Sequence, residues 1–171
     1  ALNVSYLDIS FSNIYSLEGI QNFLNLIFFD CSNNQLTMFN AQGLTNLQYL
    51  YCFDNQITSL NVQGLTNLTS LLCGFNRLPS LNIQGLTNLS ILDCGYNQLT
   101  SLNAGGLANI NQLNCQFNQL VSLNVQGLTS LDLLDFNNNL ISSVNLEGLT
   151  NLNSLICNNN LLSAIAFMMV S

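Results

Sequence analysis

The chain has 171 residues, which is enough for one domain with a continuous core. Apolar residues make up 49% and charged residues only 5%; Arg77 is the single basic residue, and the net charge is −7. One cation argues against nucleic acid and anionic membrane surfaces, which attract many Lys or Arg, and no apolar run reaches the ~20 residues of a membrane-spanning helix. We therefore expect no nucleic-acid partner and no membrane insertion.

A 21-residue pattern repeats from Leu26 to the C-terminus, and a 22-residue version with Ser12 in place of the usual Asn precedes it. A fixed period of this length is typical of stacked repeat architectures. We predict a single domain over residues 1–171. Its eight repeats are 4–25, 26–46, 47–67, 68–88, 89–109, 110–130, 131–151 and 152–171.

Each repeat is expected to form one short strand followed by turns. In the third repeat, apolar and polar residues alternate over Tyr49 to Phe53, which is the pattern of a half-buried strand. A glycine such as Gly64 then permits a turn, and at most a short 3-10 segment follows it. One repeat cannot bury its apolar positions alone, so neighbouring strands should pair in parallel and stack these positions in internal rows.

Six cysteines occupy the same position of their repeats, where a buried leucine would be expected. Phe136 fills this position in one repeat, so the site selects for apolar side chains. We predict buried free thiols; disulfides are the alternative, although stacked strands lie ~4.7–4.9 Å apart and a disulfide requires Cβ atoms ~3.8 Å apart. Without His or a C-x2-C pair, no metal site is expected.

An asparagine follows each strand, with Asn55 and Asn97 as examples. Its side chain can donate and accept at once, so it can bond turn backbone groups of its own coil and of the next coil. We therefore predict a ladder of asparagines along the stack.

The repeated motif is L-x-x-L-x-C-x-x-N-x-L, followed by x-x-L-x-(V/A/I)-x-G-L. It resembles the bacterial leucine-rich repeat of the 21-residue class with Cys in place of the third Leu, and SLEGIQNFLNL in the first repeat resembles the internalin-type unit. The resemblance implies an α/β-type leucine-rich repeat solenoid. This is a right-handed parallel β superhelix with short strands on its concave face and turns or 3-10 segments on its convex face.

The resemblance also implies a bacterial protein that is secreted or on the cell surface, but it names no ligand, because fold does not fix function. Neither end has an obvious polar cap, and the C-terminal residues are AIAFMMVS. Since exposed core ends are sticky, we expect the chain to be a fragment of a longer protein.

The outward strand positions vary while the core repeats, so we expect the ligand-binding site there. The candidate ligand-binding residues are Tyr6, Phe28, Tyr49, Tyr51, Phe53 and Asp30. Exposed aromatic patches favour contacts with proteins or sugar rings. The alternative interpretation is that these rings cover the N-terminal end of the core.

Two further rows stand out. Asp8, Asp30, Asp93 and Asp135 share one strand position and are interpreted as a solvated face, because a calcium site needs six or more oxygens and only the first two can be neighbours. Phe75, Tyr96 and Phe117 align on consecutive repeats, either as a stacked row closing the core edge or as a ligand strip.

Thr and Asn recur on the remaining surface, for example Thr66 with Asn67 and Thr87 with Asn88. Turn capping explains them, and a regular uncharged surface that binds ice is the alternative. With no His, no Lys, no phosphate loop and no nucleophile–base pair, we expect neither an enzyme nor a cofactor. The hypotheses are a recognition scaffold for a protein or glycan, an ice-binding surface, and a structural spacer.

Overall fold

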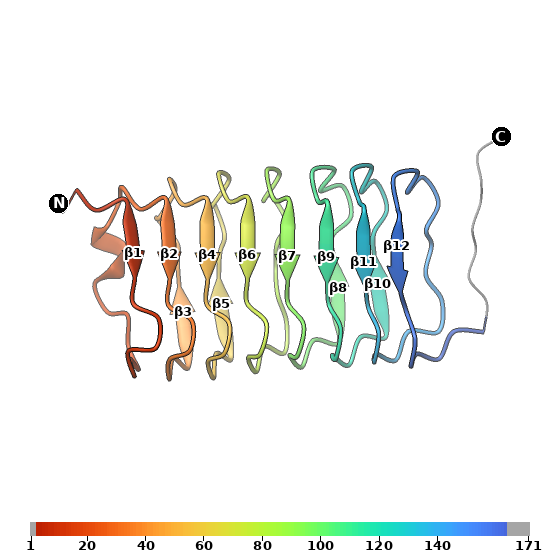
Figure 1. Cartoon of the computed structure of the whole chain (residues 1–171), viewed down its shortest axis with the longest axis horizontal. Helices are drawn as coiled ribbons and strands as arrows, with labels where there is room; N and C mark the ends of the chain where they lie inside the picture. The colour runs from red at the N-terminus through yellow and green to blue at the C-terminus, as the bar shows by residue number, and fades with distance from the viewer. Residues whose placement is uncertain (1–2, 164–171) are drawn as a thin grey trace.

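The computed structural model describes residues 3–163 and shows a solenoid whose coils stack along its long axis (Figure 1). The C-terminal segment AIAFMMVS, residues 164–171, lies outside the described residues. Three-residue strands form one parallel eight-stranded sheet along the solenoid. In sheet order they are β1 (Tyr6–Asp8), β2 (Phe28–Asp30), β4 (Tyr49–Tyr51), β6 (Ser70–Leu72), β7 (Ile91–Asp93), β9 (Gln112–Asn114), β11 (Leu133–Asp135) and β12 (Ser154–Ile156).

Residues that pair between neighbouring strands of this sheet are separated in the sequence by the length of one repeat. Leu50 of β4 lies opposite Leu71 of β6, and Leu71 lies opposite Leu92 of β7. Between β1 and β2, Leu7 lies opposite Phe29, which confirms the 22-residue alignment of the first repeat. The outward side chains of these strands form one surface, which we call the sheet face; it is the face predicted to be concave.

The opposite side of the solenoid contains turns, as predicted, and two additional parallel pairs. These pairs join β3 (Met38–Asn40) to β5 (Ser59–Asn61) and β8 (Ser101–Asn103) to β10 (Ser122–Asn124). Pro79 lies in the gap between them and removes one bond: Thr58 and Val121, at the equivalent position, donate their N–H to the preceding repeat, and proline has no N–H. Among the described residues, the one helical element is the 3-10 helix η1 (Ile20–Asn22).

The predicted apolar positions line the interior. In the third repeat, Leu47, Leu50 and Ile57 are fully buried, and Leu60 is half-buried against the core. Gly64 lies in the turn with a φ of +82°, a left-handed conformation that glycine adopts without strain. The internal rows predicted from the sequence are therefore present.

All six cysteines are free thiols, and those at positions 31, 52, 73, 94 and 115 are buried. Phe136 fills the same position with no exposed surface. The predicted buried thiols are thus confirmed, while Cys157 is half-buried near the last described coil. Burial raises the pKa of the Cys52, Cys73 and Cys94 thiols well above the usual value, which keeps them protonated and unreactive.

The predicted asparagine ladder is also present. Asn97 is buried, and its Nδ2 donates to the carbonyls of Cys94 and Gly95 in its own coil at 3.1 and 3.3 Å. The same nitrogen donates to Cys73 at 3.1 Å, and its Oδ1 accepts from the Leu78 N–H at 2.9 Å. Cys73 and Leu78 belong to the preceding coil, so the prediction of a bond to the next coil was wrong in direction.

We expect Asn97→Ala to lower the free energy of unfolding by about 1–3 kcal/mol, because it leaves the buried Leu78 N–H without a partner. Urea denaturation measures this loss. The matched control is Asn88→Ala, which removes an exposed amide with one bond to a carbonyl and should cost less. Equal midpoints for the two variants would contradict the role assigned to Asn97.

We expect thiol-specific reagents to modify the native protein at Cys157 alone, because burial protects the other five cysteines. Titration with a chromogenic disulfide should give one fast-reacting thiol in the folded protein and six after denaturation. Cys157→Ser should remove the fast phase. Rapid reaction of several thiols in that variant would show that the core opens or is not packed as described.

Candidate functional site

Four aromatic side chains meet on the first three strands of the sheet face. We call Tyr6, Phe28, Tyr49 and Tyr51 the aromatic cluster. Phe28 is its centre: it stacks on Tyr6 with a centroid distance of 4.5 Å, meets Tyr51 edge-on at 5.2 Å and lies 6.3 Å from Tyr49. Such pairs hold rings in fixed orientations and contribute ~0.5–1.5 kcal/mol each beyond burial.

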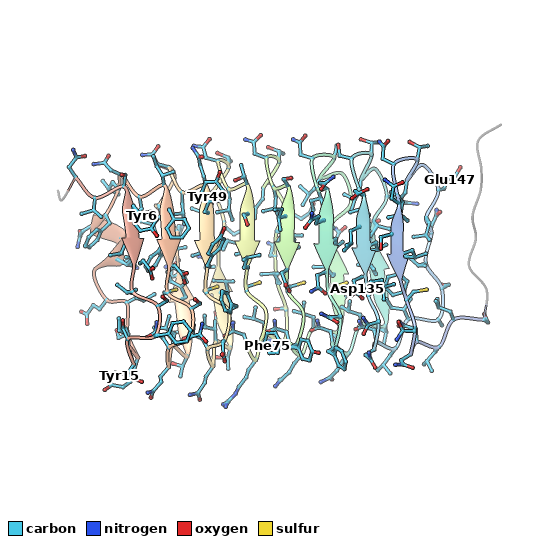
Figure 2. The ribbon with its side chains drawn as sticks, viewed as in Figure 1. Tyr6, Tyr15, Tyr49, Phe75, Asp135 and Glu147 are labelled. Atoms are coloured by element: carbon cyan, nitrogen blue, oxygen red, sulfur yellow. The ribbon has the colours of Figure 1, made fainter. Side chains whose placement is uncertain are left out.

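The aromatic cluster retains a large exposed apolar surface. Tyr6 is 62% exposed and Tyr49 is 39% exposed, while Phe28 and Tyr51 are half-buried. Figure 2 shows Tyr6 and Tyr49 on the side of the strands that faces the viewer. The rings therefore cover one another only in part, and they present a preformed apolar surface to solvent.

The other two predicted site residues have different surroundings. Phe53 follows β4 and is half-buried, and no ring contact joins it to the aromatic cluster within residues 3–163. Asp30 is paired with Tyr51 across the sheet. Its Oδ1 accepts hydrogen bonds from the Ser32 N–H at 2.8 Å and the Ser32 hydroxyl at 2.5 Å. Asp30 thus closes a turn beside the aromatic cluster.

The other members of the acidic row, which was predicted to be a solvated face, also close turns at the ends of their strands. Asp8 accepts from the N–H and hydroxyl of Ser10, and Asp93 accepts from the N–H of Gly95 at 3.0 Å. Asp135 is buried and accepts from both the N–H and the side-chain amide of Asn137. The solvated-face interpretation was therefore incomplete, because these carboxylates hold the turns that end the strands.

Phe75, Tyr96 and Phe117 form a stacked row, with centroid distances of 4.2 and 4.4 Å. They are 55%, 37% and 41% exposed, so the row closes the core edge only in part. Their φ angles of 52°, 54° and 49° are left-handed, a conformation that costs most residues ~1–2 kcal/mol, and Asn33 and Asp54 are the more usual choice at this position. Figure 2 places Phe75 beyond the ends of the strands, away from the aromatic cluster.

The Asn row on the remaining surface caps the turns, as predicted. The Asn67 Nδ2 donates to the Thr45 carbonyl at 2.9 Å, and Asn88 and Asn109 repeat this bond to Thr66 and Thr87 at 2.9 and 2.8 Å. Each bond joins a coil to the preceding one. Sequence periodicity alone located these residues, but only the structure shows their partners.

Within residues 3–163, no cluster of three or more His, Cys, Asp or Glu side chains could hold a metal ion. No helix in the same range has the length and apolarity that a membrane crossing requires.

Three solved structures share this architecture. The functional domain of InlJ from Listeria monocytogenes, which includes a cysteine ladder, is 32% identical over 91% of this chain and 35% of its own, with a TM-score of 0.88. YopM from Yersinia enterocolitica is 27% identical over 84% of this chain and 31% of its own, with a TM-score of 0.75. YopM from Yersinia pestis, described as a leucine-rich effector protein, is 26% identical over 83% and 40%, with a TM-score of 0.76.

The chain is a bacterial-type leucine-rich repeat protein with cysteine-containing repeats. No family model and no curated protein matches it. The leucine-rich repeat chain spans about a third of the length of the InlJ structure. The fold supports a protein-interaction scaffold in general.

We expect Asp93→Asn and Asp8→Asn to change stability in opposite directions at about pH 7. Burial raises the pKa of Asp93, so its ionised form weakens folding as pH rises through that pKa, and an amide should raise the melting temperature. Asn114 already makes the same turn bond at the equivalent position, accepting from the Gln116 N–H at 3.1 Å.

The N–H and hydroxyl of Ser10 lower the pKa of Asp8, so its stabilising effect is present at neutral pH and is lost as pH falls through that pKa. Asp8→Asn should therefore lower the melting temperature at about pH 7, and both differences should shrink toward about pH 3. Melting curves over this range are the measurement. The same sign for both variants at neutral pH would contradict the assigned causes.

Proposed function

We propose that this leucine-rich repeat protein is a non-enzymatic recognition scaffold that binds a protein partner through the sheet face. The observation that supports this proposal is the exposed aromatic cluster of Tyr6, Phe28, Tyr49 and Tyr51, which lies on paired strands. Tyrosine is enriched among the residues that dominate binding energy at protein interfaces, because a large ring and a hydroxyl are buried together.

Preorganisation favours the same function. The strands beneath the rings pair in register, and Phe29 and Leu50 anchor them with fully buried side chains. A partner that docks there would immobilise few side chains, which lowers the entropic cost of binding. Phe53 and Asp30 extend the proposed contact surface from the same two coils.

A glycan is the alternative ligand for this face, since the outer ring of Tyr6 is exposed and could lie against a sugar. We infer that the protein is secreted or on the surface of a bacterium. This inference is supported by the resemblance to the InlJ domain and to YopM, the latter described as an effector.

Ice binding remains the second candidate, because Thr45, Thr66 and Thr87 are exposed at the spacing of the repeats. Ala108 interrupts this row at the next repeat. Thermal hysteresis in solution, lost in Thr66→Tyr and Thr87→Tyr, would support that function and not recognition by the aromatic cluster.

The decisive experiment is a pull-down from host surface extract, run beside a glycan array, with a Tyr49→Ala, Tyr51→Ala, Phe53→Ala triple variant. We expect the native protein to retain a protein partner and the variant to lose at least tenfold in affinity, because interface aromatic anchors are worth ~2 kcal/mol or more each. Circular dichroism and the thermal midpoint establish that the variant is folded.

The matched control is Phe75→Ala, Tyr96→Ala, Phe117→Ala, which removes three exposed rings from another edge of the solenoid. This control should keep the partner. Equal loss in both triple variants would point to non-specific aromatic adhesion, retention by the array alone would favour a glycan, and no ligand for any form would favour a structural spacer.

A further inference from the structure

A second surface of the solenoid has the chemistry of a binding site. Two hollows, of about 500 and about 380 Å³, share the side chains of Gln48 and Asn67 and form one continuous groove. We call it the amide groove. It runs across several coils beside the beginning of the strands, and no residue of the aromatic cluster lines it. Its residues lie outside the core and outside the proposed protein site.

The amides in this groove have fixed orientations. Asn46, Asn67 and Asn88 each donate through Nδ2 to a backbone carbonyl of the preceding coil at 2.9 Å. Because the partner is an acceptor, the nitrogen must point toward it, and the side-chain oxygen must point the other way. The groove thus repeats an oriented acceptor once per coil.

Hydroxyl groups alternate with these amides across the groove. The Thr69 Oγ1 donates to the Gln48 carbonyl at 3.0 Å, which leaves its lone pairs free to accept a bond. Ser90 occupies the equivalent position in the next coil. A ligand with many hydroxyl groups can donate to the oriented oxygens and accept from the remaining amide protons.

The absence of charge in the lining of the groove discriminates between neutral and charged ligands that are rich in hydroxyl groups. No ionisable side chain lines either hollow. A charged polymer would find no opposite charge in the lining with which to form an ion pair. An anionic polymer would also face a net charge of −7 with one basic residue in the chain. The lining therefore favours a neutral ligand.

The repeat sets the shape of the ligand. Equivalent groups recur at the strand spacing of ~4.7–4.9 Å, which is close to the advance per residue of an extended sugar polymer. A groove that is open and shallow makes few contacts per coil, so useful affinity requires a ligand that contacts several coils at once. We propose that the amide groove binds a neutral polysaccharide that lies along the solenoid axis.

Affinity electrophoresis in gels that contain hydroxyethylcellulose, xylan, galactomannan, laminarin or dextran tests this proposal. We expect at least one neutral polymer to retard the native protein, and anionic alginate to leave its mobility unchanged. Ser90→Ile replaces a hydroxyl that lines the groove with a larger apolar side chain that cannot form a hydrogen bond, and it should weaken the retardation at least tenfold. Gln48 and Ile27 show that larger side chains fit the equivalent position.

Ser101→Ile is the matched control, because it makes the same substitution on exposed β8 of the opposite side. It should keep full retardation, as should the Tyr49→Ala, Tyr51→Ala, Phe53→Ala variant, which separates this site from the proposed protein site. Retardation by none of the neutral polymers overturns the proposal, and so does full retardation of Ser90→Ile. Thermal hysteresis without retardation would assign the surface to ordered water instead.

Discussion

The asparagine that follows the strand, which is buried in the five central coils, makes the hydrogen bonds on which the stack depends. Asn76 donates to the carbonyls of Cys73 and Gly74 in its own coil and of Cys52 in the preceding coil, and it accepts from the Ile57 N–H. These backbone groups lie where the chain leaves the strand, and of the four only the Gly74 carbonyl also has a backbone partner, the Asp54 N–H at 3.1 Å. One amide therefore satisfies the turn and fixes each coil on its neighbour.

Because the coils must stack, the positions of the repeat differ in which side chains they accept. Inward positions accept only apolar side chains that fit a stacked row, and the Cys position shows how narrow that choice is, since Phe136 is its one replacement within residues 26–163. Outward strand positions carry no such requirement, so rings can gather at one end of the sheet around Phe28. Polar residues two positions apart then close the strand ends, as Asp30 and Ser32 do.

The repeat also turns single side chains into extended surfaces. Phe75, Tyr96 and Phe117 stack because each coil presents its ring at the same place, and stacking offsets part of the left-handed backbone strain. The amide groove arises in the same way from Asn67, Asn88 and their equivalents. A repeat scaffold can thus carry a compact apolar site and a long polar one without any change in its core.

The sequence by itself determined the coil, its strand and its core. A 21-residue period, an apolar position occupied by Cys and a following Asn leave one way to bury the apolar side chains, and each expected strand is present within residues 3–163. Tertiary structure alone decided which partner each polar group found. Contacts in space set the direction of the Asn97 bonds and the turn role of Asp93. They also set the separation of Phe53 from the other rings and the interruption of the second ladder at Pro79. Periodicity fixes which residues are equivalent, but hydrogen bonds and ring contacts depend on distance and orientation in space.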